Sequence, residues 1–557
     1  MSDITIFTAR RIVTMNPANP EGPAVAVCDG RVLGVGTVDE LAGWGEFTLD
    51  DQFADKVLLP GFIEVHSHSS TGADWLAPYV GYFDRTAPDG LIWKGCKSIP
   101  EVVHRLKELD EEMTASGAAA DDLLFAWGLD PLYFEGERMY AKHLDEVSLT
   151  RPIFVHHISH HLATVNSALL EQEGISADST TPGVAKDKAG EPNGELQEPS
   201  GMALATEAWD AYAKARTAPE AIWNYGFEAR NTGTTMVADL GTGALDQETV
   251  DIWEAAVEDD EFPCRVMLTA SAFYGEIGDP AEHATRTAAL RAEYTNKLRM
   301  GIVKLILDGS IQGFTARLSW PFYFDPPPNS PENGLWLTAP DQVADLLLAY
   351  HRAGLTVHCH CNGDQATEAY IDAVEEVLER HPRWDHRHTV QHCQLTKRSQ
   401  YRRMAALGMC ANIFSNHLFF WGDQHRDHTV GLERARGMDA CATALAEGVS
   451  ISMHSDSSVT PLGALHVAWC AVNRRTATGD TIGEHEQISV AEALHALTIG
   501  SAFQMKVDHE VGSIEAGKLA DFAVLDDDPY AVDPIDLKNI GVWGTVVGGV
   551  LYEAERR

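Results

Sequence analysis

The sequence predicts an α/β protein: a TIM-like (β/α)8 barrel with an inserted segment, plus a small β-sandwich domain formed by both chain termini. Three observations support this prediction. The middle of the 557-residue chain alternates short apolar runs with helical patterns, which indicates a parallel sheet covered by helices. Both chain ends carry β-branched strand patterns instead. The stretch from the first to the last predicted barrel strand exceeds the ~250 residues of a plain barrel, so we expect an insertion.

The two chain ends predict the β domain. Strand patterns rich in β-branched residues cover residues 4–14, 24–37, 521–526 and 541–552. Asp29-Gly30 provides a hairpin turn within the first group. Two groups of short strands at opposite ends have little other way to bury their faces and edges than to pair with each other. We therefore assign residues 1–57 and 506–557 to one composite domain.

Short apolar runs in the middle of the chain predict the barrel strands. They cover residues 57–65, 235–239, 301–308, 355–360 and 389–392. Helical patterns over residues 341–351 and 366–380 lie between them. We assign residues 58–505 to the barrel, with the insertion within about residues 69–220. Inside this insertion, the Gly-, Pro- and acid-rich stretch 178–201 predicts a long loop.

Composition and charge limit the class of partner. The chain has 42 Lys and Arg residues against 82 Asp and Glu, a formal net charge of −40, which argues against a nucleic-acid or anionic-membrane binder. No apolar run is long enough to span a membrane, and the start shows no secretory pattern. Nine cysteines, an odd number, indicate free thiols in a reducing compartment, so we expect a cytoplasmic protein.

Histidine, lysine and aspartate residues follow the predicted barrel strands. His66 and His68 alternate at the end of one apolar run, so both imidazoles can face the same point. Other such groups lie in or just after separate runs: Lys304, His360, His392 and Asp456. Because parallel barrel strands deliver their carboxyl ends to one face, these side chains can meet in one pocket. Burying these polar and charged groups would cost free energy without partners or a metal. His and Asp are zinc ligands.

Two stretches resemble the metal-dependent amidohydrolase superfamily. Leu59-Pro-Gly-Phe-Ile-Glu-Val-His-Ser-His68 resembles its first-strand signature, and residues 512–525 resemble its C-terminal hallmark. Four internal stretches are similar to the amidohydrolase family 3 branch, which includes N-substituted formamide deformylase: residues 303–316, 360–364, 388–392 and 454–461. The resemblance covers nearly the whole chain and is weakest from about residue 69 to 220.

The resemblance implies a divalent metal, Zn, with one or two ions per chain. It assigns the metal ligands to His66, His68, Lys304, His360, His392 and Asp456. Asp456 and Lys304 are the catalytic candidates, with Asp456 as the proton shuttle. Lys304 matches a lysine that can be carbamylated to N6-carboxylysine and bridge two metals. The alternative is an unmodified ammonium anchored near the site.

The implied reaction is hydrolysis of a C–N amide bond, in an N-acyl or N-formyl amine or a cyclic amide, by a metal-activated water. The alternative enzyme activities at the same site are those of a hydrolytic deaminase or of an ester or lactone hydrolase. A metal-dependent isomerase or lyase is a further alternative. A non-catalytic barrel scaffold is the alternative of a different class. No Gly-x-Ser-x-Gly elbow, Walker A or Gly-x-Gly-x-x-Gly fingerprint supports other chemistries.

Two departures from the family pattern concern the substrate. Many relatives carry Glu where this chain has Gln391, and Ser-Arg-Thr-Ala where it has residues 313–316. We expect both positions near the substrate pocket. The substrate-binding candidates are His161, His425, Phe314 and Trp421. Their rings fit a small-molecule substrate with an apolar or aromatic part.

The run His156-His-Ile-Ser-His-His161 has two readings. The resemblance matches His161 and Asn166 to a substrate-pocket pattern, whereas the density of imidazoles in the run also suggests a second metal site. Cys359 and Cys361 flank a proposed ligand, but strand alternation turns them away from it, so we expect small core residues there. The sequence does not fix the oligomeric state; barrels of this kind often pair, which keeps a homodimer open.

Overall fold

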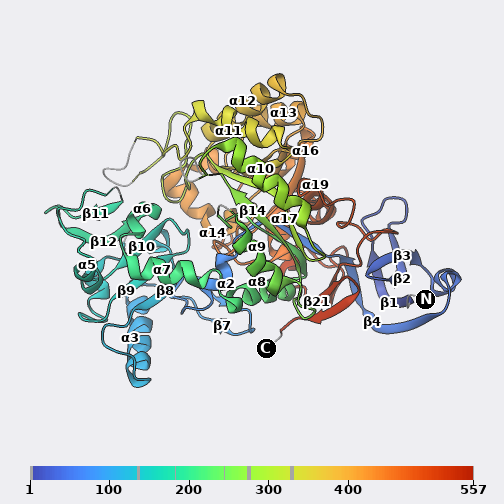
Figure 1. The fold of residues 1–557 in the computed structure, drawn as a ribbon, viewed down its shortest axis with the longest axis horizontal. Helices are drawn as coiled ribbons and strands as arrows, with labels where there is room; N and C mark the ends of the chain where they lie inside the picture. The colour runs from blue at the N-terminus through green and yellow to red at the C-terminus, as the bar shows by residue number, and fades with distance from the viewer. Residues whose placement is uncertain are drawn as a thin grey trace. The chain divides into compact units, whose positions relative to one another are not determined.

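The computed structural model describes residues 4–134, 138–181, 183–243, 245–272, 277–326 and 332–555. The chain forms two compact units, one of Met1–His68 with Gly226–Ala554 and one of Ser69–Tyr225 with Glu555–Arg557 (Figure 1). Residues 1–3 and 556–557 of the predicted terminal domain lie outside the described residues, as does Pro182 of the predicted loop. Among the helices described, none has the length and apolar character needed to cross a membrane.

The first unit contains an eight-stranded sheet in the order β19-β18-β17-β16-β15-β14-β13-β5. All its neighbouring strands are parallel, and a parallel bridge between Ser67 and Ser457 brings the segment after the last strand back to the first. This confirms the predicted barrel. Its strands are β5 (Phe62–Ser67), β13 (Thr234–Asp239), β14 (Arg265–Ser271), β15 (Leu298–Ile306), β16 (Thr356–Cys361), β17 (Thr389–His392), β18 (Cys410–Ile413) and β19 (Ser450–Met453).

Helices follow the barrel strands along the chain (Figure 1). They include α9 (Gln247–Val257), α10 (Pro280–Leu290), α11 (Pro340–Arg352), α12 (Asp364–Arg380), α13 (Arg398–Leu407), α16 (Cys441–Ala446) and α17 (Ala464–Asn473). On β16, Cys359 and Cys361 belong to the same buried apolar cluster as Tyr370 of α12, as strand alternation predicts. The alternate positions, His358 and His360, are left to face the inside of the barrel.

Both chain termini build a seven-stranded sheet in the order β22-β21-β20-β4-β1-β2-β3, which confirms that the ends combine. Its strands are β1 (Ile4–Val13), β2 (Glu21–Cys28), β3 (Arg31–Gly36), β4 (Phe47–Pro60), β20 (Phe522–Leu525), β21 (Val542–Val547) and β22 (Val550–Glu553). The apolar run 57–65 is divided between two sheets at Gly61, where a Cβ atom would lie 1.9 Å from Thr235 Oγ1. The domain boundaries at residues 57/58 and 505/506 stay a prediction.

The second unit is built around a five-stranded sheet in the order β11-β12-β10-β9-β8. Its elements are α2 (Ser70–Asp74), α3 (Ile99–Ala115), β8 (Leu124–Leu129), α4 (Ala141–Leu144), β9 (Ile153–His157), β10 (Leu162–Val165), α5 (Ser167–Gln172), β11 (Val184–Lys186), β12 (Pro192–Gln197), α6 (Glu198–Met202) and α7 (Thr206–Ala215). The stretch 178–201, expected as a loop, contains the β11–β12 hairpin and the first residues of α6. β12 pairs with β10, and the Asp187 carboxylate accepts from the backbone N–H groups of Ala189 and Glu191 to hold the turn.

A buried ion pair joins the barrel to the terminal sheet within the first unit. Arg265, at the start of β14, donates from Nε and Nη2 to the two carboxylate oxygens of Asp521, at 2.7 and 2.9 Å. Asp521 directly precedes β20 and also accepts from the backbone N–H of Gly548 at 2.7 Å. Both side chains are buried, so each charge depends on the other for its solvation.

We predict that Asp521→Ala lowers the free energy of unfolding by about 3–5 kcal/mol, because it leaves the Arg265 guanidinium buried without its counter-ion. Urea unfolding followed by circular dichroism measures the loss. The matched control is Asp345→Ala, whose partner Arg380 also lies at 2.8 Å but in an exposed ion pair. We expect the control to change stability by less than ~1 kcal/mol. Equal losses in the two variants would contradict the assigned role of Asp521.

Candidate metal centre

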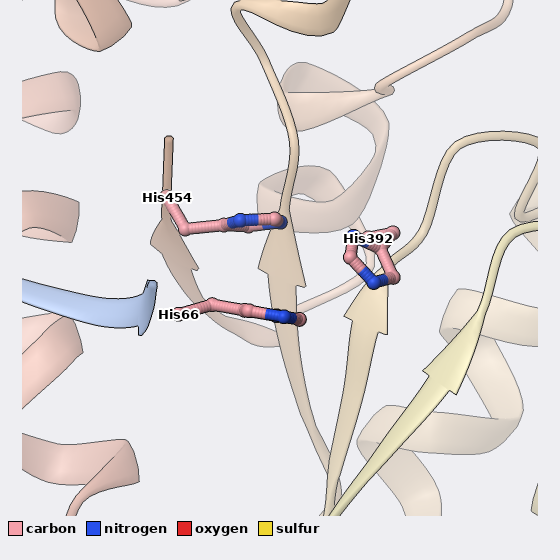
Figure 2. Close-up of side chains that lie close together, drawn as sticks. All are labelled: His66, His392 and His454. Carbon is pink, nitrogen blue, oxygen red and sulfur yellow. The ribbon is translucent and has the colours of Figure 1, made fainter. Parts of the chain in front are cut away.

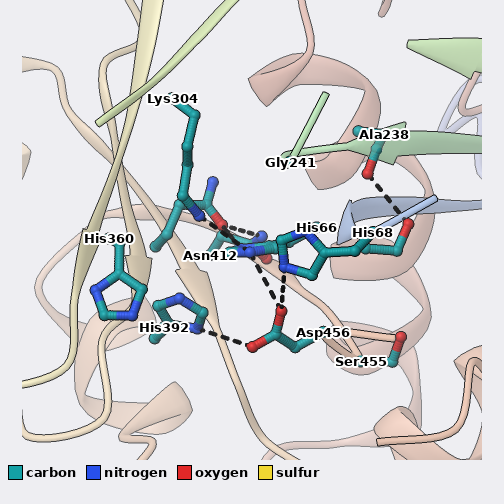
Figure 3. Close-up of polar contacts among 12 residues, drawn as sticks. His66, His68, Ala238, Gly241, Lys304, His360, His392, Asn412, Ser455 and Asp456 are labelled. Atoms are coloured by element: carbon teal, nitrogen blue, oxygen red, sulfur yellow. Dashed lines mark hydrogen bonds and ion pairs between the residues drawn. The ribbon is translucent and has the colours of Figure 1, made fainter. Parts of the chain in front are cut away.

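The barrel brings the predicted site residues of the first unit to one rim (Figure 3). His66 lies on β5 and His68 just after it, and Asp456 follows β19. The Asp456 carboxylate oxygen Oδ1 lies 3.1 Å from His68 Nε2 and 3.3 Å from His66 Nε2. Its other oxygen lies 3.8 Å from His392 Nδ1, at the end of β17. One carboxylate therefore faces three imidazoles.

Lys304 and His360 occupy the neighbouring strands. Lys304, on β15, places Nζ 3.0 Å from His66 Nε2, and burial lowers the pKa of this lysine to about 8. His360, on β16, stands with its ring centroid 4.4 Å from that of His392. Its Nδ1 is 3.4 Å from an oxygen of Asp308. His360 thus joins the group through His392 rather than through Asp456.

His454 belongs to the same group, although sequence reasoning gave it no role. Figure 2 shows its ring lying over that of His66, and the ring planes are 15° apart with centroids separated by 4.7 Å. Its position two residues before Asp456, inside a recognised stretch, was the available signal. Nitrogen atoms of His66, His392 and His454 lie within 4.8 Å of one another, as do ligand atoms of His66, His68 and Asp456.

The protonation states of these groups fit a metal ion. Both ring nitrogens of His392 and of His454 are buried without a hydrogen-bond partner, which is costly unless something else satisfies them. Burial lowers the pKa of His454 to about 3 and holds the pKa values of His66 and His392 well below their usual range. Burial alone would raise the pKa of Asp456, but the hydrogen bond from His68 contributes to lowering it to about 2. Neutral imidazoles and an ionised carboxylate are the ligand forms that metals require.

The backbone at the rim is held in an unusual conformation. His392 and Asp456 both adopt left-handed φ angles, of 75° and 55°. Non-glycine residues adopt this geometry at a cost in conformational free energy, and such residues cluster at functional sites.

The carboxylate of Glu64 accepts from the backbone N–H of His66 at 3.1 Å and from the hydroxyl of Ser455 at 2.7 Å, which ties β5 to the segment carrying Asp456. Burial raises the pKa of Glu64 to about 8.

Gln391 orients His66 instead of facing an open pocket. We expected this residue near the substrate, but its side chain is fully buried and its amide is occupied. Its Oε1 lies 2.8 Å from His66 Nδ1 and accepts from Asn412 Nδ2 at 2.7 Å, while its Nε2 donates to His358 Nδ1 at 2.8 Å. An Oε1 acceptor keeps the proton on His66 Nδ1, so the lone pair of His66 lies on Nε2, the nitrogen that faces Asp456 and Lys304.

Ring contacts connect the centre to two predicted substrate residues, Trp421 on α14 (His417–Gln424) and His425 directly after it. Phe414 lies 4.6 Å from His454 and 5.0 Å from His417, measured between ring centroids. His417 in turn stacks on His425 and lies 4.7 Å from Trp421. His425 is fully buried, with Nδ1 and Nε2 partnered by Thr429 and His417.

The other two substrate candidates lie elsewhere in the fold. Phe314 has a left-handed φ of 59° in the segment after β15, and its ring centroid is 5.1 Å from that of Tyr323. His161 belongs to the second unit, where its Nδ1 is 2.8 Å from a carboxylate oxygen of Glu198. Asn166, matched with it in sequence, caps α5 through its side-chain oxygen and so has a structural role.

Comparisons with known proteins agree over almost the whole chain. Residues 54–552 match a family described as "Amidohydrolase family". The chain is 27% identical to N-substituted formamide deformylase from Arthrobacter pascens, over 99% of each protein. It is 27% identical to Protein LONG AFTER FAR-RED 3 from Arabidopsis thaliana, over 98% of this chain and 90% of that protein. The crystal structure of an uncharacterized metal-dependent hydrolase from Pyrococcus horikoshii OT3 shares the fold, with a TM-score of 0.70 at 20% identity over 96% of this chain and 99% of that one.

We predict that Gln391→Leu weakens metal binding by about 10–100-fold, because it removes the acceptor that fixes the tautomer of His66. Gln391→Glu is the matched control, since a carboxylate oxygen can accept the same hydrogen bond and metal affinity should stay near that of the wild type. Competition with a chromogenic chelator measures both affinities. If both variants bound metal as the wild type does, Gln391 would have no orienting role.

Proposed function

Because the chain belongs to the amidohydrolase family, we propose that it hydrolyses a C–N amide bond of a small molecule at the barrel rim. The observation that carries this proposal is the convergence of three imidazoles, two of them buried, around the carboxylate of Asp456. The proposed substrate is an N-acyl or N-formyl amine or a cyclic amide. The N-substituted formamide deformylase among the relatives makes the formyl case the first to test.

The residues that would hold the metal are His66, His68, Lys304, His360, His392 and Asp456. His454 is a further candidate ligand, because both of its ring nitrogens are buried and unpartnered. Imidazole and carboxylate ligands suit zinc, which is the ion we propose. The chemistry that a divalent ion supplies when bound is polarisation of the substrate carbonyl and a lowered pKa of water, towards ~7.

Asp456 is the proposed proton shuttle. One of its oxygens lies 3.1 Å from His68 Nε2, which holds the carboxylate at the rim in its ionised form. There it can take the proton of the attacking water and deliver it to the departing amine, so that one carboxylate serves both proton transfers. Gln391 contributes by holding His66, and Glu64 by holding the segment that carries Asp456.

Phe314, Trp421 and His425 of the first unit are proposed to line the substrate pocket, whereas substrate binding by His161 of the second unit stays a prediction from the sequence. Support for Trp421 and His425 comes from the ring contacts that run from His454 through Phe414 and His417 to both residues. Aromatic rings next to a polar centre suit a substrate with an apolar or aromatic part. We also propose a cytoplasmic location, since all nine cysteines are free thiols.

We predict that the zinc-loaded protein hydrolyses N-formyl or N-acyl amines, and that Asp456→Asn lowers kcat by about 10²–10⁴-fold because the proton shuttle is lost. Liquid chromatography with mass spectrometry detects the added water and the released amine. Asp345→Asn, which changes an exposed carboxylate, is the control and should keep wild-type activity.

Other products would indicate a different function. Release of ammonia without amide cleavage would indicate a deaminase, ester or lactone cleavage alone would indicate that hydrolase class, and product of unchanged mass would indicate an isomerase. A protein that binds no Zn, Mn, Co or Fe and has no activity would be a scaffold.

Lys304 is proposed to carry N6-carboxylysine, because its Nζ lies 3.0 Å from a ring nitrogen of His66, at the position of a ligand. We then expect inductively coupled plasma mass spectrometry to count about one metal ion fewer per chain in Lys304→Met than in the wild type, since the side chain can no longer carry a carboxylate. Lys142→Met, an exposed control, should keep the wild-type count. Equal counts in Lys304→Met and the wild type would show that Lys304 is an unmodified anchor.

A further inference from the structure

The second unit contains a group of side chains that the proposed reaction does not use: Asp74, His156 and His160. We propose that this Asp74 cluster binds a divalent transition-metal ion. Each residue offers one ligand atom, and these atoms all lie within 4.8 Å of one another. The proposal does not depend on the function proposed for the barrel, because all three residues belong to the second unit.

Three different elements bring the Asp74 cluster together. Asp74 is the last residue of α2 and is fully buried. His156 lies on β9, and His160 lies in the turn between β9 and β10. His160 adopts a left-handed φ of 58°, an unfavourable geometry for a residue with a Cβ atom. This turn places His160 Nε2 3.4 Å from Asp74 Oδ2. The turn therefore brings an imidazole to the buried carboxylate.

His156 provides the strongest evidence for a missing ligand. Its side chain is 2% exposed, and its Nε2 is buried without a hydrogen-bond partner. Its ring stands edge-on to that of His160, with centroids 4.7 Å apart. Native proteins satisfy almost all of their buried polar atoms, so a buried, unpartnered nitrogen on an imidazole that is grouped with a second imidazole and a carboxylate calls for a cation.

Tyr212 on α7 sets the protonation state of the cluster. Its hydroxyl donates to Asp74 Oδ1 at 2.9 Å and lies 3.3 Å from His160 Nδ1. With the single hydroxyl proton donated to Asp74, we assign the Nδ1–H tautomer to His160, which then donates to the hydroxyl oxygen. The lone pair of His160 is then on Nε2, facing the carboxylate oxygen Oδ2. Two acceptors at 3.4 Å repel each other unless a cation lies with them.

The alternative cation is a proton, which would turn His160 into an imidazolium paired with Asp74. That proton would leave the buried Nε2 of His156 unsatisfied, whereas a metal ion satisfies all three ligands at once. Two nitrogens and one carboxylate select transition metals over Ca²⁺ and Mg²⁺, which require mostly oxygen ligands.

The test is metal stoichiometry after equilibrium dialysis of the full-length protein against Co²⁺ or Zn²⁺, with the ions counted by mass spectrometry. His156→Phe keeps a flat ring among Phe125, Phe154 and Tyr212 but removes the ligand nitrogen. We expect about one ion fewer per chain than in the wild type and a weaker Co²⁺ d–d absorption band. The barrel ions stay in this variant, so a failure of the barrel proposal would appear separately.

His157→Phe is the matched control, because His157 is the equally buried neighbour and bonds Thr164 rather than the cluster. It should keep the wild-type ion count. Tyr212→Phe should bind the ion of the cluster about 10–100-fold more weakly, because the hydrogen bond that orients Asp74 is lost. This second variant decides the question if His156→Phe does not fold. Equal ion counts in His156→Phe and wild type, or unchanged affinity in Tyr212→Phe, would overturn the proposal.

Discussion

The candidate metal centre depends on one constraint, the parallel direction of all eight strands of the barrel sheet. Parallel strands end at the same rim, so side chains far apart in sequence meet there. At this rim they meet as imidazoles around one carboxylate, and the buried ones have few other groups to satisfy them. The geometry of the fold therefore favours binding of a cation at this rim. The polar side chains inside the barrel orient the residues that would bind it.

A hydrogen-bonded layer inside the barrel supports the ligands. Ser452 lies 2.7 Å from Asn412, Asn412 donates to Gln391, and Gln391 accepts from His66. Each of these side chains is buried, and each fixes the orientation of the next. The orientation of His66 is therefore set by a chain of amide and hydroxyl groups on β17, β18 and β19. A glutamine performs here the orienting role that a carboxylate can perform at other metal sites.

The sequence predicted what depends on strand direction, and missed what depends on side-chain partners. Alternation and strand ends located His66, His392 and Asp456, because a parallel barrel leaves their position little freedom. The part played by Gln391 was not predicted, since an amide can serve equally in a substrate pocket or under a ligand, and only its three partners decide. His454 was missed for a similar reason: its ring stacking and unpartnered nitrogens are tertiary features. The hairpin within 178–201 was hidden because its turn residues dominate the composition.

Burial of a histidine is not by itself a sign of metal binding, as a third group in this chain shows. His351, His386 and His388 are as deeply buried as the candidate ligands. Every ring nitrogen among them has a partner: His351 Nδ1 lies 2.9 Å from His388 Nε2, and the other nitrogens meet backbone groups. Such histidines are a satisfied part of the core. His156 and His454 differ from them because each has an unpartnered buried nitrogen and belongs to a group of potential ligand atoms, a combination that metal binding explains and core packing does not.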